Sequence, residues 1–108
     1  MGKSSQRKGR AAEIELCGVL NDNGIPATPG AAVSYGSTPD IIGVTGIHVE
    51  CKRHERLQLP EWIRQAERDA EFFQDGAPAV FFRRSREPWY VTMRLEDWLK
   101  LYTEAKRR

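Results

Sequence analysis

The chain lacks any long apolar segment. No apolar run in its 108 residues approaches the ~20 residues that a membrane-spanning helix needs. The first ten residues are basic and polar and have no apolar core after them, which excludes a secretory signal. Gln6 stands where the myristoylation pattern requires Ser or Thr. Without repeats or an interdomain linker, residues 1–108 are expected to form one domain with a single core and no membrane anchor.

Cysteine is also scarce. Cys17 and Cys51 are the two cysteines, and their separation matches no metal-binding spacing. Because the chain has no secretory signal, a disulfide between them is not expected. Both are predicted to pack as small apolar side chains.

The net charge of +2 is too small to indicate a partner by itself, but the positive charges are grouped. Such groups suit phosphate backbones, and they are equally typical of solvated chain ends and turns. The three groups are Lys3, Arg7, Lys8 and Arg10; Arg83, Arg84 and Arg86; and Lys106, Arg107 and Arg108.

Hydrophobic periodicity and turn residues predict the element order α-β-β-β-α-β-β-α. Residues 1–6 are expected to be a flexible basic arm. The first helix is predicted to end before Gly24, and Pro60 suits the first turn of the second helix. The predicted helices are residues 8–23, 60–73 and 95–106, and the predicted strands are 31–35, 40–44, 47–52, 79–83 and 89–93.

Three polar residues stand out in the predicted hairpin that turns at Thr45-Gly46. Asp40 follows a proline and opens one apolar strand, and Glu50 and Lys52 lie in the next. Since side chains alternate along a strand, Glu50, Lys52 and His48 share one face and Cys51 lies on the other. A short hairpin brings the Asp40 carboxylate close to Glu50. By itself, the pattern also fits a solvated salt bridge between Glu50 and Lys52.

Two adjacent carboxylates repel each other unless a cation lies between them. Carboxylate and carbonyl oxygens suit Mg²⁺ or Mn²⁺, and the backbone carbonyl of Cys51 is placed to be a further ligand. Such a metal can polarise a phosphoryl oxygen and lower the pKa of a bound water. Lys52 can orient that water or neutralise charge on the phosphate. The pattern therefore indicates phosphodiester hydrolysis.

Helical phase adds a third acid. Glu13 shares a face with the apolar residues of the first helix, whereas Glu15 points nearly opposite. A carboxylate on an apolar face needs a partner, which is either the metal site or an arginine. Gln65 flanks the apolar stripe of the second helix, where it either bonds the site or lies on the surface. Ser37 precedes Asp40 and can touch a phosphate, while His48 is expected to be solvated or hydrogen-bonded.

These residues resemble the PD-(D/E)xK nuclease superfamily, and most closely the small archaeal and phage Holliday-junction resolvases. The resemblance covers most of the chain. Gly9 to Glu13 resembles the family's Gly-x-x-x-Glu helix, and Pro39-Asp40 with Glu50-Cys51-Lys52 fills the motif that names the family. Ser37 and Gln65 match a loop serine and a helix glutamine of the family.

The resemblance implies a restriction-endonuclease-like α/β core with a mixed sheet, and metal-dependent DNA cleavage that leaves a 5′-phosphate. It implies Asp40 and Glu50 as metal ligands, Glu13 as a ligand through water, and Lys52 as catalytic. It also implies a cytoplasmic homodimer of a bacterial, archaeal or phage-infected cell that acts on branched DNA. Lys3, Arg7, Lys8, Arg10 and Ser37 are the candidate DNA contacts. A restriction- or repair-type nuclease subunit and a non-catalytic nucleic-acid-binding module are the alternatives.

Overall fold

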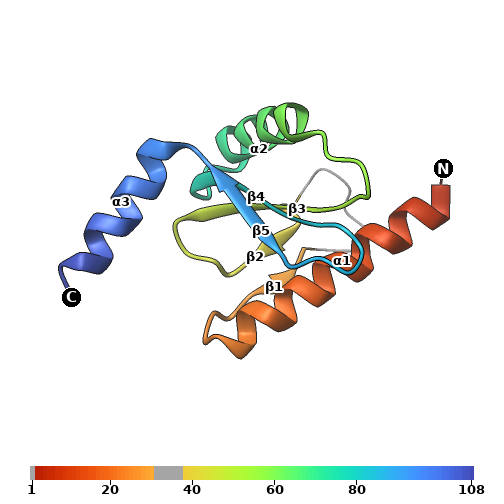
Figure 1. Ribbon diagram of the computed structural model, residues 1–108, viewed down its shortest axis with the longest axis horizontal. Helices are drawn as coiled ribbons and strands as arrows, with labels where there is room; N and C mark the ends of the chain where they lie inside the picture. Colours follow the sequence, from red (N-terminus) through yellow and green to blue (C-terminus); the bar gives the residue numbers. More distant parts are fainter. Residues whose placement is uncertain (1, 31–37) are drawn as a thin grey trace.

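The computed structural model describes the backbone of residues 2–30 and 38–108, with side chains described from residue 9 onward in those ranges. The element order is the one predicted. The helices are α1 (Gly2–Asp22), α2 (Leu59–Phe73) and α3 (Leu95–Lys106), and the strands are β1 (Thr28–Pro29), β2 (Ile41–Ile42), β3 (Ile47–Arg53), β4 (Ala77–Arg83) and β5 (Tyr90–Met93) (Figure 1).

The strands form one five-stranded mixed sheet in the order β1-β2-β3-β4-β5. Only β3 and β4 pair in parallel, since the crossover between them contains α2, and the other neighbours are antiparallel. This confirms the predicted fold class. Strand β3 therefore lies in the middle of the sheet, where both of its faces are covered.

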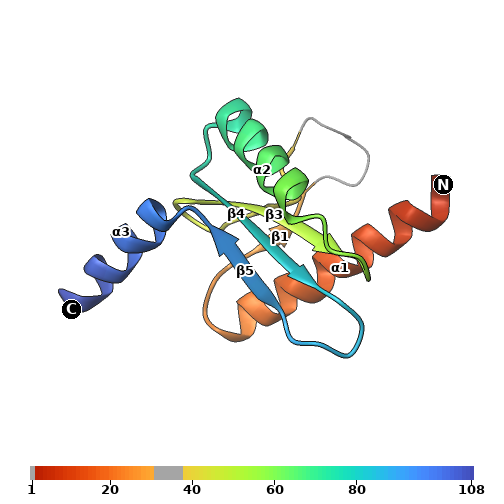
Figure 2. The same ribbon diagram turned by 45° about the horizontal axis from the view of Figure 1, so that its top comes forward.

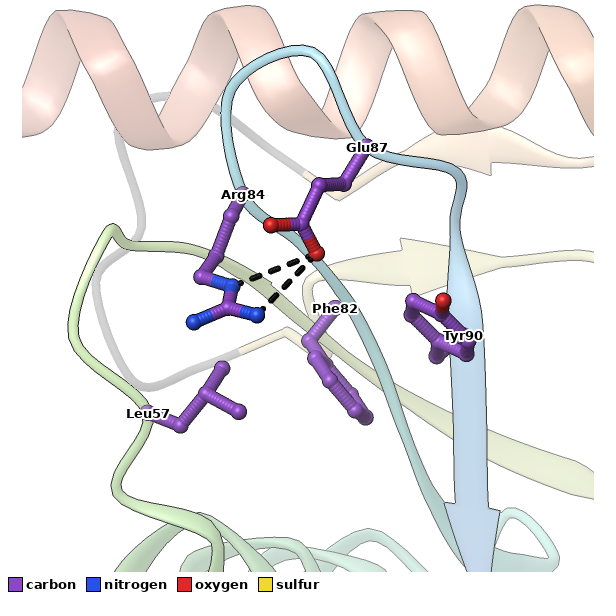
Figure 3. Close-up of a pocket in the computed structure, with 5 residues that line it drawn as sticks. All are labelled: Leu57, Phe82, Arg84, Glu87 and Tyr90. Atoms are coloured by element: carbon purple, nitrogen blue, oxygen red, sulfur yellow. Dashed lines mark hydrogen bonds and ion pairs between the residues drawn. The ribbon is translucent and has the colours of Figure 1, made fainter.

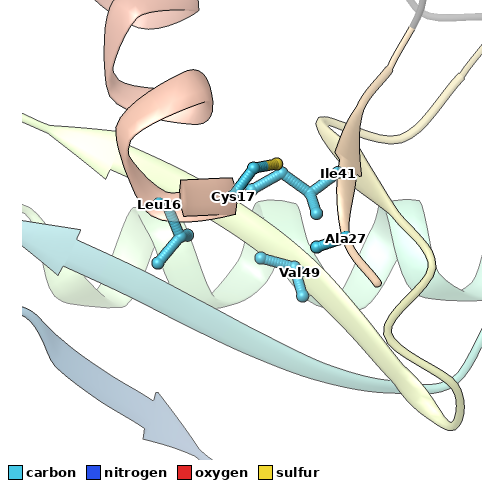
Figure 4. Close-up of a cluster of buried hydrophobic side chains, with 5 residues drawn as sticks. All are labelled: Leu16, Cys17, Ala27, Ile41 and Val49. Atoms are coloured by element: carbon cyan, nitrogen blue, oxygen red, sulfur yellow. The ribbon is translucent and has the colours of Figure 1, made fainter. Parts of the chain in front are cut away.

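Helices α1 and α2 lie on opposite faces of the sheet (Figures 1 and 2). On the α1 face, a buried cluster is formed by Leu16, Cys17, Ala27, Ile41 and Val49 (Figure 4). On the α2 face, Trp62, Ala66 and Val80 form a second cluster. The alternation along β3 thus directs Val49 toward α1 and leaves its even-numbered residues facing α2.

The β2–β3 hairpin sets the register of the polar residues. Gly43 and Gly46 adopt positive φ angles of 96° and 84°, which end β2 after two residues and turn the chain into β3. The strand is consequently shorter than the predicted range 40–44. Ile41 pairs with Val49 in antiparallel register, so Asp40 lies opposite Glu50.

Two expectations about the N-terminal half need correction. The expected flexible arm of residues 1–6 is wrong from Gly2 onward, because α1 begins there. No proline interrupts this segment, and its residues extend the packed helix without a steric cost. The helical spacing of Ala12, Leu16, Val19 and Leu20 predicts Val19 on the apolar face of the first helix, but Val19 is exposed, whereas Cys17 is buried as predicted. The predicted strand 31–35 lies outside the described residues, and β1 comes earlier in the chain.

Among the described residues, no helix is both long enough and apolar enough to cross a membrane.

A glycine fixes the position of Asp40. The Gly30 N–H donates a 2.8 Å hydrogen bond to the Asp40 carbonyl, and a Cβ at Gly30 would overlap the Pro39 carbonyl oxygen. Gly30→Ala should therefore lower the free energy of unfolding by about 1–3 kcal/mol, measured by urea denaturation. As a control, Gly18→Ala adds a methyl to the exposed side of α1, where nothing lies within 4 Å, and should raise it by ~0.5–1 kcal/mol. Equal stability of the Gly30 variant and the wild type would contradict this close approach.

Candidate active site

Asp40 is held at the start of β2, next to the central strand. It is partly buried, and its Oδ2 accepts a 3.1 Å hydrogen bond from the Cys51 N–H. The Cys51 side chain packs on the α1 face, as predicted from strand alternation. The backbone of Cys51 is thus the part of this residue that faces the Asp40 carboxylate.

Glu50 and Lys52 lie side by side on the α2 face of β3. The Glu50 carboxylate is buried, with 3% of the residue exposed, and its Oε2 lies 3.8 Å from the Lys52 Nζ. Lys52 also donates a 2.8 Å hydrogen bond to Gln65 Oε1 on α2. The structure therefore brings together Asp40 at the start of β2, Glu50 and Lys52 on β3, and Gln65 on α2.

Glu13 approaches this place from the other helix. Its side chain on α1 is 19% exposed and lies 3.5 Å from the Arg10 guanidinium, the arginine pairing that the sequence left open. Burial raises the pKa of Glu13, the nearby Asp40 carboxylate raises it further, and Arg10 partly offsets both. Glu15 instead forms a 2.6 Å ion pair with Arg83 outside the site. Glu13 is therefore both paired with Arg10 and electrostatically coupled to Asp40.

The electrostatics of the site centre on Glu50. Burial raises the pKa of Glu50 to about 7, with a smaller contribution from the Asp40 carboxylate. The hydrogen bond with His48 and the charge of Lys52 act in the opposite direction. A buried carboxylate with so high a pKa gains most from a further positive charge, so the donor set of Asp40 and Glu50 fits a divalent cation.

His48 connects Glu50 to an acid that the sequence analysis did not identify. Its ring is 1% exposed, Nδ1 lies 2.9 Å from Asp75 Oδ1, and Nε2 lies 3.4 Å from Glu50 Oε1. The ring also stacks on Phe73, with centroids 6.2 Å apart. His48 is thus the satisfied histidine of the two expected alternatives. The alternation of side chains along the strand predicted that His48 lies near Glu50, but nothing in the sequence indicated that Asp75 contacts His48.

A second set of donors surrounds Glu50. His48, Glu50 and Asp69 each offer one atom within 4.8 Å of the others, and neither Asp40 nor Glu13 belongs to this group. Burial opposes charging of His48, but hydrogen bonds with Glu50 and Asp75 outweigh it and raise the pKa of His48. The hydrogen bonds therefore favour the charged form of His48, which would supply a positive charge within this second set.

The basic residues differ in how far their own chain engages them. Arg10 contacts Glu13 and donates to the Gly30 carbonyl. Arg83 is bonded to Glu15, and Arg84 to Glu87, so these two arginines are tied within the fold. The side chains of Lys3, Arg7 and Lys8 lie outside the described residues, as do Ser37 and its loop.

A surface pocket of about 220 Å³ is lined by residues of β4, of β5 and of the loops next to them. Phe82, which neighbours Lys52 in the parallel β3–β4 register, stacks on Tyr90 with ring centroids 5.7 Å apart. Leu57 faces these rings, and the Arg84–Glu87 ion pair closes one rim (Figure 3). The pocket thus combines an aromatic wall with a charged edge, and its Phe82 lies one strand away from Lys52.

The pKa of Glu50 predicts how stability depends on pH. The folded chain holds the Glu50 proton more tightly than the unfolded chain does, because the pKa of Glu50 is about 7 when folded and 4.5 in its ordinary state. The burial of Glu50 therefore lowers the free energy of unfolding as the pH rises through the range between these two values. Without metal, Glu50→Gln should be more stable than the wild type by about 2 kcal/mol at pH 8, and the gain should disappear by about pH 5. Thermal unfolding in EDTA measures this difference.

The control is Glu15→Gln. That carboxylate is partly exposed and bonded to Arg83, so its loss should bring no gain that grows with pH. A Glu50→Gln variant that is less stable than the wild type at pH 8 would show that Glu50 is already compensated by His48 and Lys52.

Comparison with known proteins identifies the family. Residues 4–108 match the family described as "Phage putative PDDEXK endonuclease". The fold is similar to that of Hjc, a Holliday junction resolvase from the archaeal hyperthermophile Archaeoglobus fulgidus, with a TM-score of 0.59 and 25% sequence identity over 80% of this chain and 72% of that one. No curated protein sequence matches. Since the family match extends over nearly all of the sequence, the chain belongs to this family of phage PD-(D/E)xK endonucleases.

Proposed function

We propose that the protein is a Mg²⁺-dependent, structure-selective DNA endonuclease that resolves Holliday junctions. The observation that carries the proposal is the convergence of Asp40, Glu50 and Lys52 at the β2–β3 junction, with Lys52 held by Gln65. The similarity of the fold to a Holliday junction resolvase supports the choice of substrate. A phage nuclease of this kind would act in the cytoplasm of the bacterial or archaeal host.

The proposed metal ligands are the carboxylates of Asp40 and Glu50 and the backbone carbonyl of Cys51, with Glu13 acting through water. All are oxygen donors, which suit Mg²⁺ and also accept Mn²⁺. When bound, the metal would polarise the scissile phosphate and supply an activated water. The raised pKa of Glu50 supports this assignment, because a cation would favour its ionised form.

Lys52 is the proposed catalytic base or charge stabiliser. Its Nζ is fixed between Glu50 and Gln65, so it does not swing freely as a surface lysine does. Fixed donors aimed at a developing negative charge contribute more than mobile ones. Gln65 is therefore proposed to position Lys52, and Glu50 to keep it close to the scissile phosphate.

The proposed substrate is branched DNA, bound by a homodimer whose two sites cut opposed strands. Lys3, Arg7, Lys8, Arg10 and Ser37 are the proposed phosphate contacts, which would give binding a strong salt dependence. We propose that the pocket of Phe82 and Tyr90 stacks a base that the branch point of the substrate exposes, because bases stack on aromatic rings.

A restriction- or repair-type nuclease subunit would share this site, and only its substrate would distinguish it. A purely binding module is less consistent with the geometry. Two acids facing DNA weaken binding to phosphates, and such a module has no use for the lysine that Gln65 holds beside them.

A substrate panel tests the proposed chemistry. The wild type should introduce paired, symmetric nicks in four-way junctions with Mg²⁺ and none with EDTA, read on denaturing gels, and should cut duplex much more slowly. Asp40→Asn and Glu50→Gln should each reduce the rate by at least ~10³-fold while junction affinity persists. Glu15→Gln, outside the site, should cut normally. No cleavage of junctions, flaps or duplex with Mg²⁺ or Mn²⁺ would exclude a nuclease, whereas cleavage of all three at similar rates would exclude a resolvase.

The aromatic pocket gives a second test. Tyr90→Ala should weaken binding to a four-way junction by about 1–2 kcal/mol while changing affinity for plain duplex little, measured by fluorescence anisotropy in Ca²⁺. Val91→Ala is the matched control, because Val91 is similarly exposed and points to the other face of β5. Equal losses for the two variants, or for the two DNAs, would remove the pocket from substrate recognition.

A further inference from the structure

Helix α3 presents an apolar face to solvent. Its 12 residues include no buried one. Five of its large apolar side chains are between 45% and 68% exposed: Leu95, Trp98, Leu99, Leu101 and Tyr102. Both ribbon views show α3 extending away from the sheet after β5 (Figures 1 and 2). Neither of the two buried clusters includes a residue of α3.

The exposed residues form one stripe. Leu95, Trp98, Leu99 and Tyr102 follow each other at helical spacings of three and four, and Leu101 adjoins them. Trp98 stacks on Tyr102 with ring centroids 5.1 Å apart, which makes the stripe a continuous surface. An isolated helix shorter than ~12–15 residues is marginal in water, so a helix held by so little of its own domain needs a covering partner.

The charges of α3 identify the kind of partner. Glu96 and Asp97 lie in its first turn, and Lys106 lies in its last, followed by two arginines. At ~100° per residue, Glu96 lies about 60° and Lys106 about 20° around the helix from Leu99. Glu96 therefore borders the Leu99 side of the stripe, and Lys106 continues that side toward the other end of the helix. In an antiparallel pair of identical helices, same-side flanking positions face each other.

We propose that α3 is the dimer interface, packing antiparallel against α3 of a second copy around a two-fold axis. In that arrangement each Glu96 faces Lys106 of the other copy, and the two apolar stripes cover each other. A two-fold interface must be self-complementary, and α3 meets this condition in both shape and charge. The inference rests on the homodimer proposed above, but not on the nuclease chemistry.

The oligomeric state in solution tests the apolar part. Sedimentation equilibrium of the wild type is measured without DNA or metal. The mass should reach twice the 12.3 kDa of one chain as the concentration is raised to about 200 µM. Leu99→Asp should weaken the dimer at least ~100-fold, since it places a charge on the stripe. Lys100→Glu, one residue later and about 100° further around the helix, lies outside the stripe and should leave the dimer intact. Circular dichroism should show both variants folded, because the buried clusters lie elsewhere.

Exchanged charges test the orientation. Glu96→Lys and Lys106→Glu should each weaken self-association by about tenfold, because each places like charges opposite one another twice in the dimer. Mixed together, these two variants should form a heterodimer of wild-type affinity, since both pairs again join opposite charges, one of them with its signs reversed. In a parallel pair Glu96 would face Glu96 and Lys106 would face Lys106, so neither single exchange would weaken association relative to the wild type.

The outcomes separate the interface from the dimer itself. A wild type that stays monomeric overturns both, and leaves the α3 face to another protein or to a membrane surface. A wild-type dimer that Leu99→Asp does not weaken places the interface elsewhere on the chain. A dimer that Leu99→Asp disrupts but that mixed charge variants do not restore overturns the antiparallel arrangement. None of these results depends on whether the protein cuts DNA.

Discussion

The arrangement of the polar residues depends on one constraint, the burial of the Glu50 carboxylate between the sheet and α2. A buried carboxylate must be compensated, and here compensation comes from both sides along the strand. His48, held by Asp75, lies on one side, and Lys52, held by Gln65, lies on the other. The pKa of Glu50 nevertheless stays near 7, so these two partners do not fully offset its desolvation. The metal ion proposed between Asp40 and Glu50 would supply the positive charge that these partners do not.

The two faces of the sheet contribute differently to the site. On the α1 face, the apolar cluster around Val49 holds β3 in the core, and α1 brings Glu13 near Asp40. The α2 face supplies the polar partners of Glu50. Because β3 is the central strand, any shift of its register by one residue would exchange these faces and bury Lys52 among Leu16 and its neighbours. The site is therefore as strongly specified as the core.

The core of this arrangement could be predicted from local pattern. The period of two along β3 placed Glu50 and Lys52 together, and helical phase separated Glu13 from Glu15. Asp69 and Asp75 could not be found in this way, since their distance from His48 depends on how α2 crosses the sheet and on the left-handed Gln74 that ends it. The same tertiary packing explains why Val19 is exposed while Cys17 is buried: an apolar stripe does not show which of its edges meets the sheet.

The position of α3 bears on how two such sites can act together. In the sheet order the site lies at β2 and β3, whereas α3 follows β5 at the opposite edge. Two chains joined through α3 would therefore keep both Asp40–Glu50 sites open to DNA and hold them on outward sides of the pair. A dimer formed through the β1 edge would instead place the partner beside Asp40 and restrict access to it. The exposed apolar face of α3 is thus compatible with the proposed site, because association and cleavage would use opposite edges of the same sheet.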